Sequence, residues 1–179
     1  MVEEGAEAGY RVKEVWNSVT LPHEAVARTN DVRGWALVTA ATPGARLDQA
    51  CFAVDLASLH SIDPPALPGQ QVSGRDEALG LVLDYAKHPV ARLTIASTGI
   101  TPSIGGSTAH LTIPGTLEIA GVVRPVNFDT QIQLNADAVS VAGKTGITRD
   151  DFRIQFGQGA PVDIDQHVTI EFSLVMRRP

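Results

Sequence analysis

Residues 115–134 constrain the fold most, because they carry the pattern of a β-hairpin. Apolar and polar residues alternate over 115–119 and again over 126–134, as strands with one buried and one solvated face require. The turn between these arms contains Gly121, which can adopt a positive φ, and Pro125, which fits only near the start of a strand or on an edge. Such a hairpin fixes the register of both its strands.

The rest of the chain also has the pattern of short strands. We expect strands over residues 10–16, 25–29, 32–39, 47–56, 91–97, 108–113, 138–142 and 168–176. The only convincing helix follows Ser73, where Leu79, Val82 and Leu83 have helical spacing, and it must end before Pro89. Eight to ten strands joined mostly by short turns, without βαβ alternation, predict an all-β antiparallel barrel or sandwich with one short α-helix.

Length and charge limit the domain count and the partners. The chain has 179 residues, which is enough for one domain with a sizeable core. Its net charge is −6, so it offers no basic stripe to neutralise phosphates, and we expect no nucleic-acid partner. The single cysteine, Cys51, lies in an apolar run where a buried thiol is expected.

The first residues predict no targeting or membrane segment. The beginning of the chain is acidic, whereas a signal peptide begins basic and then becomes apolar, and no run of about 18 apolar residues is present. We expect residues 1–9 to form a disordered leader and residues 10–179 to form a single domain.

Five segments, taken in order, resemble segments of the YceI-like family, lipocalin-like bacterial proteins known as polyisoprenoid-binding proteins. They are GYRV with EAVARTNDVRG (9–12 and 24–34), the VD and SLHSID of 54–63, the Arg75-Asp76 pair, GTLEIAGVVRPV (115–126) and TRDDF (148–152). The resemblance covers residues 9–178 and implies a lipocalin-like barrel of about eight strands. It also implies a periplasmic, secreted or membrane-tethered protein, while the lack of a signal peptide leaves a cytoplasmic location open.

The sequence departs from the family's pattern at one motif. His88 stands before Pro89 where the family usually has an aromatic residue, and Leu93 ends the run where a Phe is usual. The loss of two aromatic side chains would widen the pocket of a family member or change its ligand.

No motif predicts catalysis, a metal or a cofactor. The chain lacks a Gly-x-Ser-x-Gly elbow, a phosphate-binding loop and a His-Glu-x-x-His helix, and its five histidines have no metal-ligand spacing. The acidic pairs Asp150-Asp151 and Asp163-Ile-Asp165 could bind a cation, but solvated turns are the favoured interpretation. We therefore expect no cofactor.

An apolar interior is the remaining place for a function. An eight-stranded barrel is either filled by its own side chains or holds one small ligand. Aromatic residues make up 5% of the chain and the inward positions are mostly Ala, Val, Leu and Ile, which favours a cavity, although small residues can also pack a narrower barrel. The larger apolar residues expected to line a cavity are Trp35, Phe52, Val54, Leu79, Leu83, Phe128, Ile132, Ile170 and Phe172.

Four arginines are candidates for holding an anionic head group at the barrel mouth by charge-assisted hydrogen bonds: Arg75, Arg92, Arg124 and Arg149. Isolated surface arginines are the alternative interpretation.

These observations favour a binding protein that carries or sequesters a long hydrophobic ligand, which the resemblance suggests is a polyisoprenoid, an isoprenoid quinone or a fatty-acid derivative. The partner would then be a hydrophobic small molecule or lipid, and a homodimer is left open. One alternative is a cyclase or isomerase that folds a hydrophobic polyene in a dry pocket. The other is a packed structural barrel with a protein partner. Polar residues inside the barrel would favour the enzyme, and a filled interior would favour the structural protein.

Overall fold

The computed structural model describes residues 1–2, 5–17, 21–40, 45–64, 72–96, 108–134, 138–156 and 161–177. Its strands are β1 (Glu7–Trp16), β2 (His23–Thr29), β3 (Val32–Ala40), β4 (Ala45–Asp55), β5 (His60–Ser61), β6 (Val90–Ile95), β7 (Thr108–Ile119), β8 (Val122–Leu134), β9 (Ala138–Thr148) and β10 (Val162–Arg177). They form one sheet in the order β3-β4-β6-β7-β8-β9-β10-β1-β2-β5. Every pairing in it is antiparallel.

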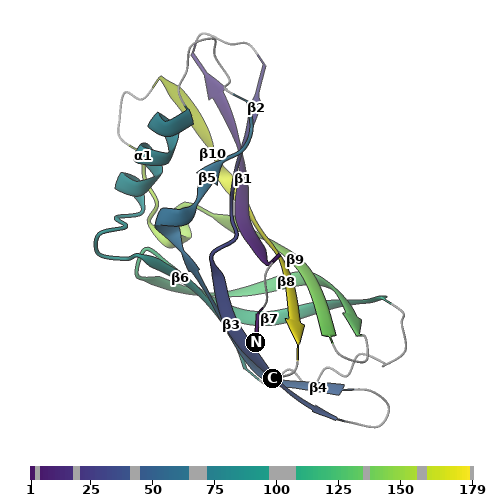
Figure 1. Ribbon diagram of the computed structural model, residues 1–179. Coiled ribbons are helices and arrows are strands. Elements are labelled where there is room, and N and C mark those ends of the chain that lie inside the picture. The colour runs from purple at the N-terminus through teal and green to yellow at the C-terminus, as the bar shows by residue number, and fades with distance from the viewer. Residues whose placement is uncertain are drawn as a thin grey trace.

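The sheet curls into a lipocalin-like barrel, and the helix α1 (Val72–Val82) lies against one end of it (Figure 1). This confirms the all-β antiparallel fold with one short helix that the sequence predicts. Within the described residues no ladder joins the two outer strands, β3 and β5, so the ring of hydrogen bonds is not continuous.

The predicted hairpin is confirmed, with a shorter turn than expected. β7 and β8 pair from Ile119↔Val122 onward, and the turn is Ala120-Gly121, both at positive φ (49° and 74°). This two-residue turn matches the twist of the flanking strands. Pro125 lies within β8 rather than in the turn. It is tolerated there because β9 pairs with β8 only from Asp129 onward, so no ladder is interrupted on that side.

The strands on either side of Asn30-Asp31 are confirmed, but they do not pair with each other. β2 pairs with β1 and β5, whereas β3 pairs with β4. The hydroxyl of Thr29 accepts a hydrogen bond from the amide of Asp31 (2.9 Å). This bond stabilises the bend at which the chain leaves the β1–β2 ladder and enters the β3–β4 ladder.

The beginning of the chain takes part in the sheet, which corrects the expectation of a leader over residues 1–9. β1 begins at Glu7, three residues earlier than predicted, because Glu7 pairs with Ser173 of β10. Val2 forms a bridge with Met176 of β10, and its amide donates to the carbonyl of Gly34 on β3 (3.2 Å). Val2 therefore lies between β10 and β3, whereas Ala8 and Gly9 lie between β10 and β2.

The helix is shorter than predicted and is held by two polar contacts. It ends at Val82 rather than near His88, because Asp84 has a positive φ of 49° that an α-helix cannot continue. Arg75 pairs with Asp63, while Asp76 accepts hydrogen bonds from the amide and the hydroxyl of Ser61 (3.0 and 2.6 Å). In the described residues, no helix is long and apolar enough to cross a membrane.

Candidate functional site

A cavity of about 800 Å³ lies between α1 and the inner face of the sheet. Its lining is mostly apolar and comes from α1 and from inward positions of β1–β4 and β6–β10. The volume falls within the range of about 300–1,000 Å³ that is typical of small-molecule sites. The interior of this barrel is therefore hollow at the end that the helix covers.

Most of the residues predicted to line a cavity do so. The main cavity is lined by Phe52, Val54, Leu79, Leu83, Phe128, Ile170 and Phe172. Ile132 instead lines a smaller apolar void of about 70 Å³ deeper in the barrel. The prediction for Trp35 is wrong, because its side chain is 43% exposed on β3 and lines neither space. Its neighbour Ala36 has the inward position, so the bulky residue of this pair faces outward.

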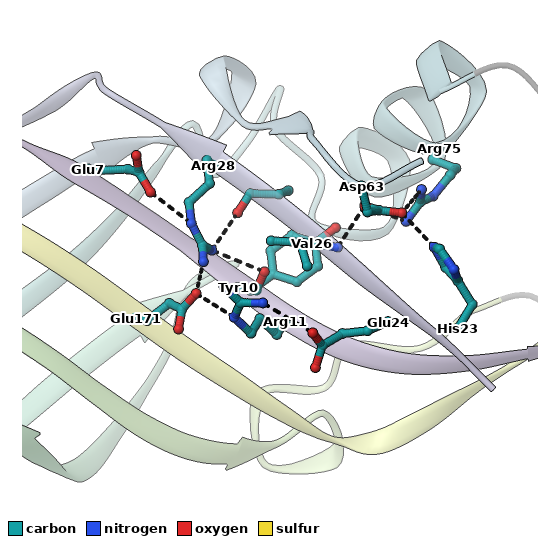
Figure 2. A network of polar contacts seen from close by, with 11 residues as sticks. Glu7, Tyr10, Arg11, His23, Glu24, Val26, Arg28, Asp63, Arg75 and Glu171 are labelled. Carbon is teal, nitrogen blue, oxygen red and sulfur yellow. Dashed lines mark hydrogen bonds and ion pairs between the residues drawn. The ribbon is translucent and has the colours of Figure 1, made fainter. Parts of the chain in front are cut away.

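Polar side chains gather where β1, β2 and the segment after β5 meet α1. We call Glu14, His23, Asp63 and Arg75 the polar cluster. Arg75 makes two contacts with the Asp63 carboxylate, 2.5 and 3.2 Å long, and His23 Nε2 lies 2.6 Å from the same carboxylate (Figure 2). Glu14 and Arg75 also line the cavity, so one edge of an otherwise apolar space is charged.

The polar cluster sets the charge states around it. Burial by itself raises the pKa of Asp63, but hydrogen bonds from Arg75, from the amide of Val26 and from His23 outweigh burial and lower this pKa below its ordinary value. Burial raises the pKa of Tyr10, which lines the cavity, to about 12, although the positive charge of Arg75 opposes the shift. Asp63 is therefore ionised and Tyr10 neutral near pH 7.

Glu14 is the residue that sequence reasoning missed. Its carboxylate is almost completely buried, accepts a hydrogen bond from the Trp16 indole (2.9 Å) and lies 3.9 Å from both His23 and Arg75. The strand pattern could have identified it, because Glu14 shares the inward face of β1 with Tyr10, Val12 and Trp16. A charged residue on that face made the alternation look weak.

The four candidate arginines do not come together. Arg75 and Arg149 line the cavity. Arg92 reaches its edge, but its side chain is half exposed and pairs with Glu118 on the outer face. Arg124 lies outside the cavity and donates to the carbonyl of Val123.

Arg149 differs from Arg75 in its partners. Its guanidinium donates to the carbonyls of Ile154, Ile164 and Asp165, and it lies over the ring of Phe156 at 5.2 Å. Among the described residues, no carboxylate lies within ion-pair distance of it. Arg149 thus brings to the cavity a positive charge that neutral groups hold in place.

A second group of charges joins β1, β2 and β10 on the outer face of the sheet. Arg28 contacts Glu7 (2.9 Å) and Glu171, and Glu171 also accepts from Arg11 (2.8 Å; Figure 2). Burial and the nearby charge of Arg11 lower the pKa of Arg28. This network ties three strands together across the sheet.

In each of the acidic pairs Asp150-Asp151 and Asp163-Ile-Asp165, one carboxylate accepts a hydrogen bond from a residue nearby in the sequence. Thr148 donates to Asp151, and Asp165 accepts from the amide of His167 (2.9 Å). Within the described ranges, no group of three or more His, Cys, Asp or Glu residues has the arrangement of a metal site.

Solved structures share this fold. A polyisoprenoid-binding domain from Saccharophagus degradans, implicated in plant cell wall breakdown, superposes with a TM-score of 0.64 at 15% identity, over 99% of this chain and 100% of that one. BcnA of Burkholderia cenocepacia gives a TM-score of 0.62 at 19% identity, over 93% and 96%. A YceI protein of Campylobacter jejuni gives 0.58 at 15% identity, over 86% and 84%.

No curated protein matches the sequence. The profile of the YceI-like domain matches residues 7–176, from the first strand of the sheet almost to the end of the last. The chain therefore belongs to the YceI-like domain family.

Proposed function

We propose that this protein binds one long-chain hydrophobic ligand in the cavity under α1 and carries or sequesters it. The observation that carries the proposal is the cavity itself, with its volume of about 800 Å³ and its mostly apolar lining. A barrel with a packed interior would have no such space. The cavity therefore disfavours the alternative of a packed structural barrel with a protein partner.

Burial of an apolar chain supplies enough free energy without any catalytic group. Each CH₂ group transferred from water contributes about 0.8 kcal/mol before the costs of ordering the ligand. The relative from Saccharophagus degradans is a polyisoprenoid-binding domain, which supports a ligand of the same class. We therefore propose a polyisoprenoid, an isoprenoid quinone or a fatty-acid derivative.

We propose that the head group of this ligand binds at Arg149, one of the two candidate arginines whose charge reaches the cavity. Arg75 is already neutralised by Asp63 and lies near the second carboxylate, Glu14, so it is poorly suited to an additional anion. Within the described structure Arg149 has three carbonyl oxygens and the ring of Phe156 as partners but no carboxylate, and its remaining donors suit a phosphate or carboxylate head group. The apolar tail would then run deeper into the barrel.

A second candidate function rests on Glu14. Its buried carboxylate lines the same cavity as the neutral phenol of Tyr10 and could transfer a proton to or from a polyene there. Incubation of the protein with an acyclic polyprenol, followed by mass and absorbance analysis, tests this candidate. A cyclised or isomerised product that disappears in Glu14→Gln would favour the enzyme over the carrier.

Matched substitutions on opposite faces of the sheet test the binding proposal. Ala91 of β6 lines the cavity, whereas Ala53 of β4 pairs with Arg92 and does not line it. We expect Ala91→Trp to fill the space and weaken binding of the fluorescent polyene cis-parinaric acid at least about tenfold, or 1.4 kcal/mol. Ala53→Trp is expected to bind as the unsubstituted protein does. Equal affinities in all three proteins would refute binding in this cavity.

A further inference from the structure

The cavity has a floor that is made largely of aromatic rings. Five residues line both the main cavity and the smaller void beneath it, and we call them the septum: Phe52, Leu93, Phe128, Phe172 and Leu174. The rings of Phe128 and Phe172 are 5.2 Å apart at their centroids, with a tilt of 55°. The septum therefore separates two apolar spaces that would otherwise be continuous.

The position of Phe172 depends on a glycine in the neighbouring strand. Phe172 of β10 pairs with Gly143 of β9, and a Cβ atom at Gly143 would lie 2.5 Å from Cζ of Phe172. Only glycine leaves room for the ring to lie across β9 toward Phe128. The sequence thus places the ring in the path between the two spaces.

The void below the septum has the character of an extension of the binding cavity. Its volume is about 70 Å³, and it is lined almost entirely by apolar side chains, among them Ile132 and Met176. Among the described residues that line the void, only Thr130 is polar, and it donates its hydroxyl to the carbonyl of Leu111 (2.7 Å). An alkyl chain could enter this space without leaving a polar group unsatisfied.

We propose that the septum, and Phe172 in particular, sets the maximum length of the hydrophobic chain that the protein buries. This inference rests on the proposed function and adds a limit to it. With about 30 Å³ for each carbon and its hydrogens, similar to the share of one water molecule in the liquid, the main cavity holds roughly 25 carbon atoms. Removal of the Phe172 ring would join the void to the cavity, and the void alone would add room for about two more carbons, besides the space that the ring itself leaves.

A series of straight-chain alcohols from about 10 to about 40 carbons tests the limit by displacement of cis-parinaric acid. For the unsubstituted protein, affinity should rise up to about fourfold for each added CH₂ and level off once the cavity is full. In Phe172→Ala the affinity should continue to rise for at least about two carbons beyond that length, because the void then becomes part of the cavity. Phe172→Leu should show a smaller extension in the same direction, and it tests the proposal if the alanine variant does not fold.

Phe156→Ala is the matched control, because Phe156 lines the main cavity but not the septum. It removes the same side-chain volume but does not open the void, so it should extend the limiting length by about two carbons less than Phe172→Ala does. An unchanged limit in both Phe172 variants, or an equal shift in the control, would overturn the role of the septum. Failure of every alcohol to bind the unsubstituted protein would instead refute the proposed function.

Discussion

Asp63→Asn is expected to destabilise the protein strongly, because it removes the charge on which the polar cluster depends. The side chain of Asp63 is 6% exposed, and its carboxylate accepts hydrogen bonds from Arg75, from His23 and from the amide of Val26 (2.8 Å). The asparagine amide cannot replace all these acceptor positions and carries no charge. Among the described carboxylates, only the more distant Glu14, 3.9 Å away, would then remain within ion-pair distance of the Arg75 side chain, which is 12% exposed.

The expected cost follows from the burial of this ion pair. Loss of one partner of a buried pair costs about 3–5 kcal/mol, since the other charge stays desolvated. Because Glu14 still compensates Arg75 in part, we expect a loss of about 3 kcal/mol in the free energy of unfolding near pH 7. The loss should also loosen α1, because Arg75 is one of its two polar anchors.

The same contact predicts a pH dependence. The folded state lowers the pKa of Asp63, so this group contributes stability above its unfolded pKa of about 3.9. That contribution is lost as the pH falls through the lower, folded-state pKa. Asp63→Asn should therefore be less stable at neutral pH and show a shallower loss of stability on acidification.

Urea unfolding followed by circular dichroism between pH 3 and pH 7 measures both effects. Asp31→Asn is the matched control, because Asp31 also makes two contacts with an arginine, Arg33 (3.0 and 3.2 Å), but on the surface. We expect the control to keep nearly the stability of the unsubstituted protein. A cost below about 1 kcal/mol for Asp63→Asn, or a cost no larger than that of the control, would refute the reasoning.

Two further predictions concern the first strand and the tyrosines. Gly9→Ala should lower the free energy of unfolding by about 3 kcal/mol or more, since its Cβ would lie 2.0 Å from the carbonyl oxygen of Ala27. Gly146→Ala is the control and should change this free energy little, because no atom lies within 4 Å of its Cβ. Equal stabilities of the two variants in urea would contradict the prediction. Burial raises the pKa of both tyrosines of the chain, Tyr10 to about 12 and Tyr85 further. Tyrosinate absorbance should therefore stay low through pH 10 while circular dichroism reports a folded protein, and a midpoint near pH 10 in the folded state would be inconsistent with buried phenols.

The alternation of the hairpin was enough to predict its two strands and the antiparallel class of the fold. Strict period-two patterning has only one structural solution when one face is buried. Phe128 and Ile132 on β8, and Ile170 and Phe172 on β10, were correctly assigned to the interior for the same reason. The patterning does not depend on distant parts of the chain.

The polar edge of the cavity depends on distant parts of the chain, and apart from Arg75 its residues were missed. Glu14, His23, Asp63 and Arg75 come from four separate segments, and no local spacing connects them. Trp35 shows the opposite failure, because its size suggested an interior residue while its strand position faces outward. Which face of an isolated strand is buried depends on its neighbours in the sheet.

Native mass spectrometry of the purified protein tests the central claim most directly. We expect a fraction of the protein to carry one apolar ligand per chain, identifiable after organic extraction, and Ala91→Trp to lose it while Ala53→Trp retains it. Protein that carries no ligand, and whose melting temperature is unchanged by an added polyprenol or fatty acid, would contradict the claim that this cavity binds a long hydrophobic chain.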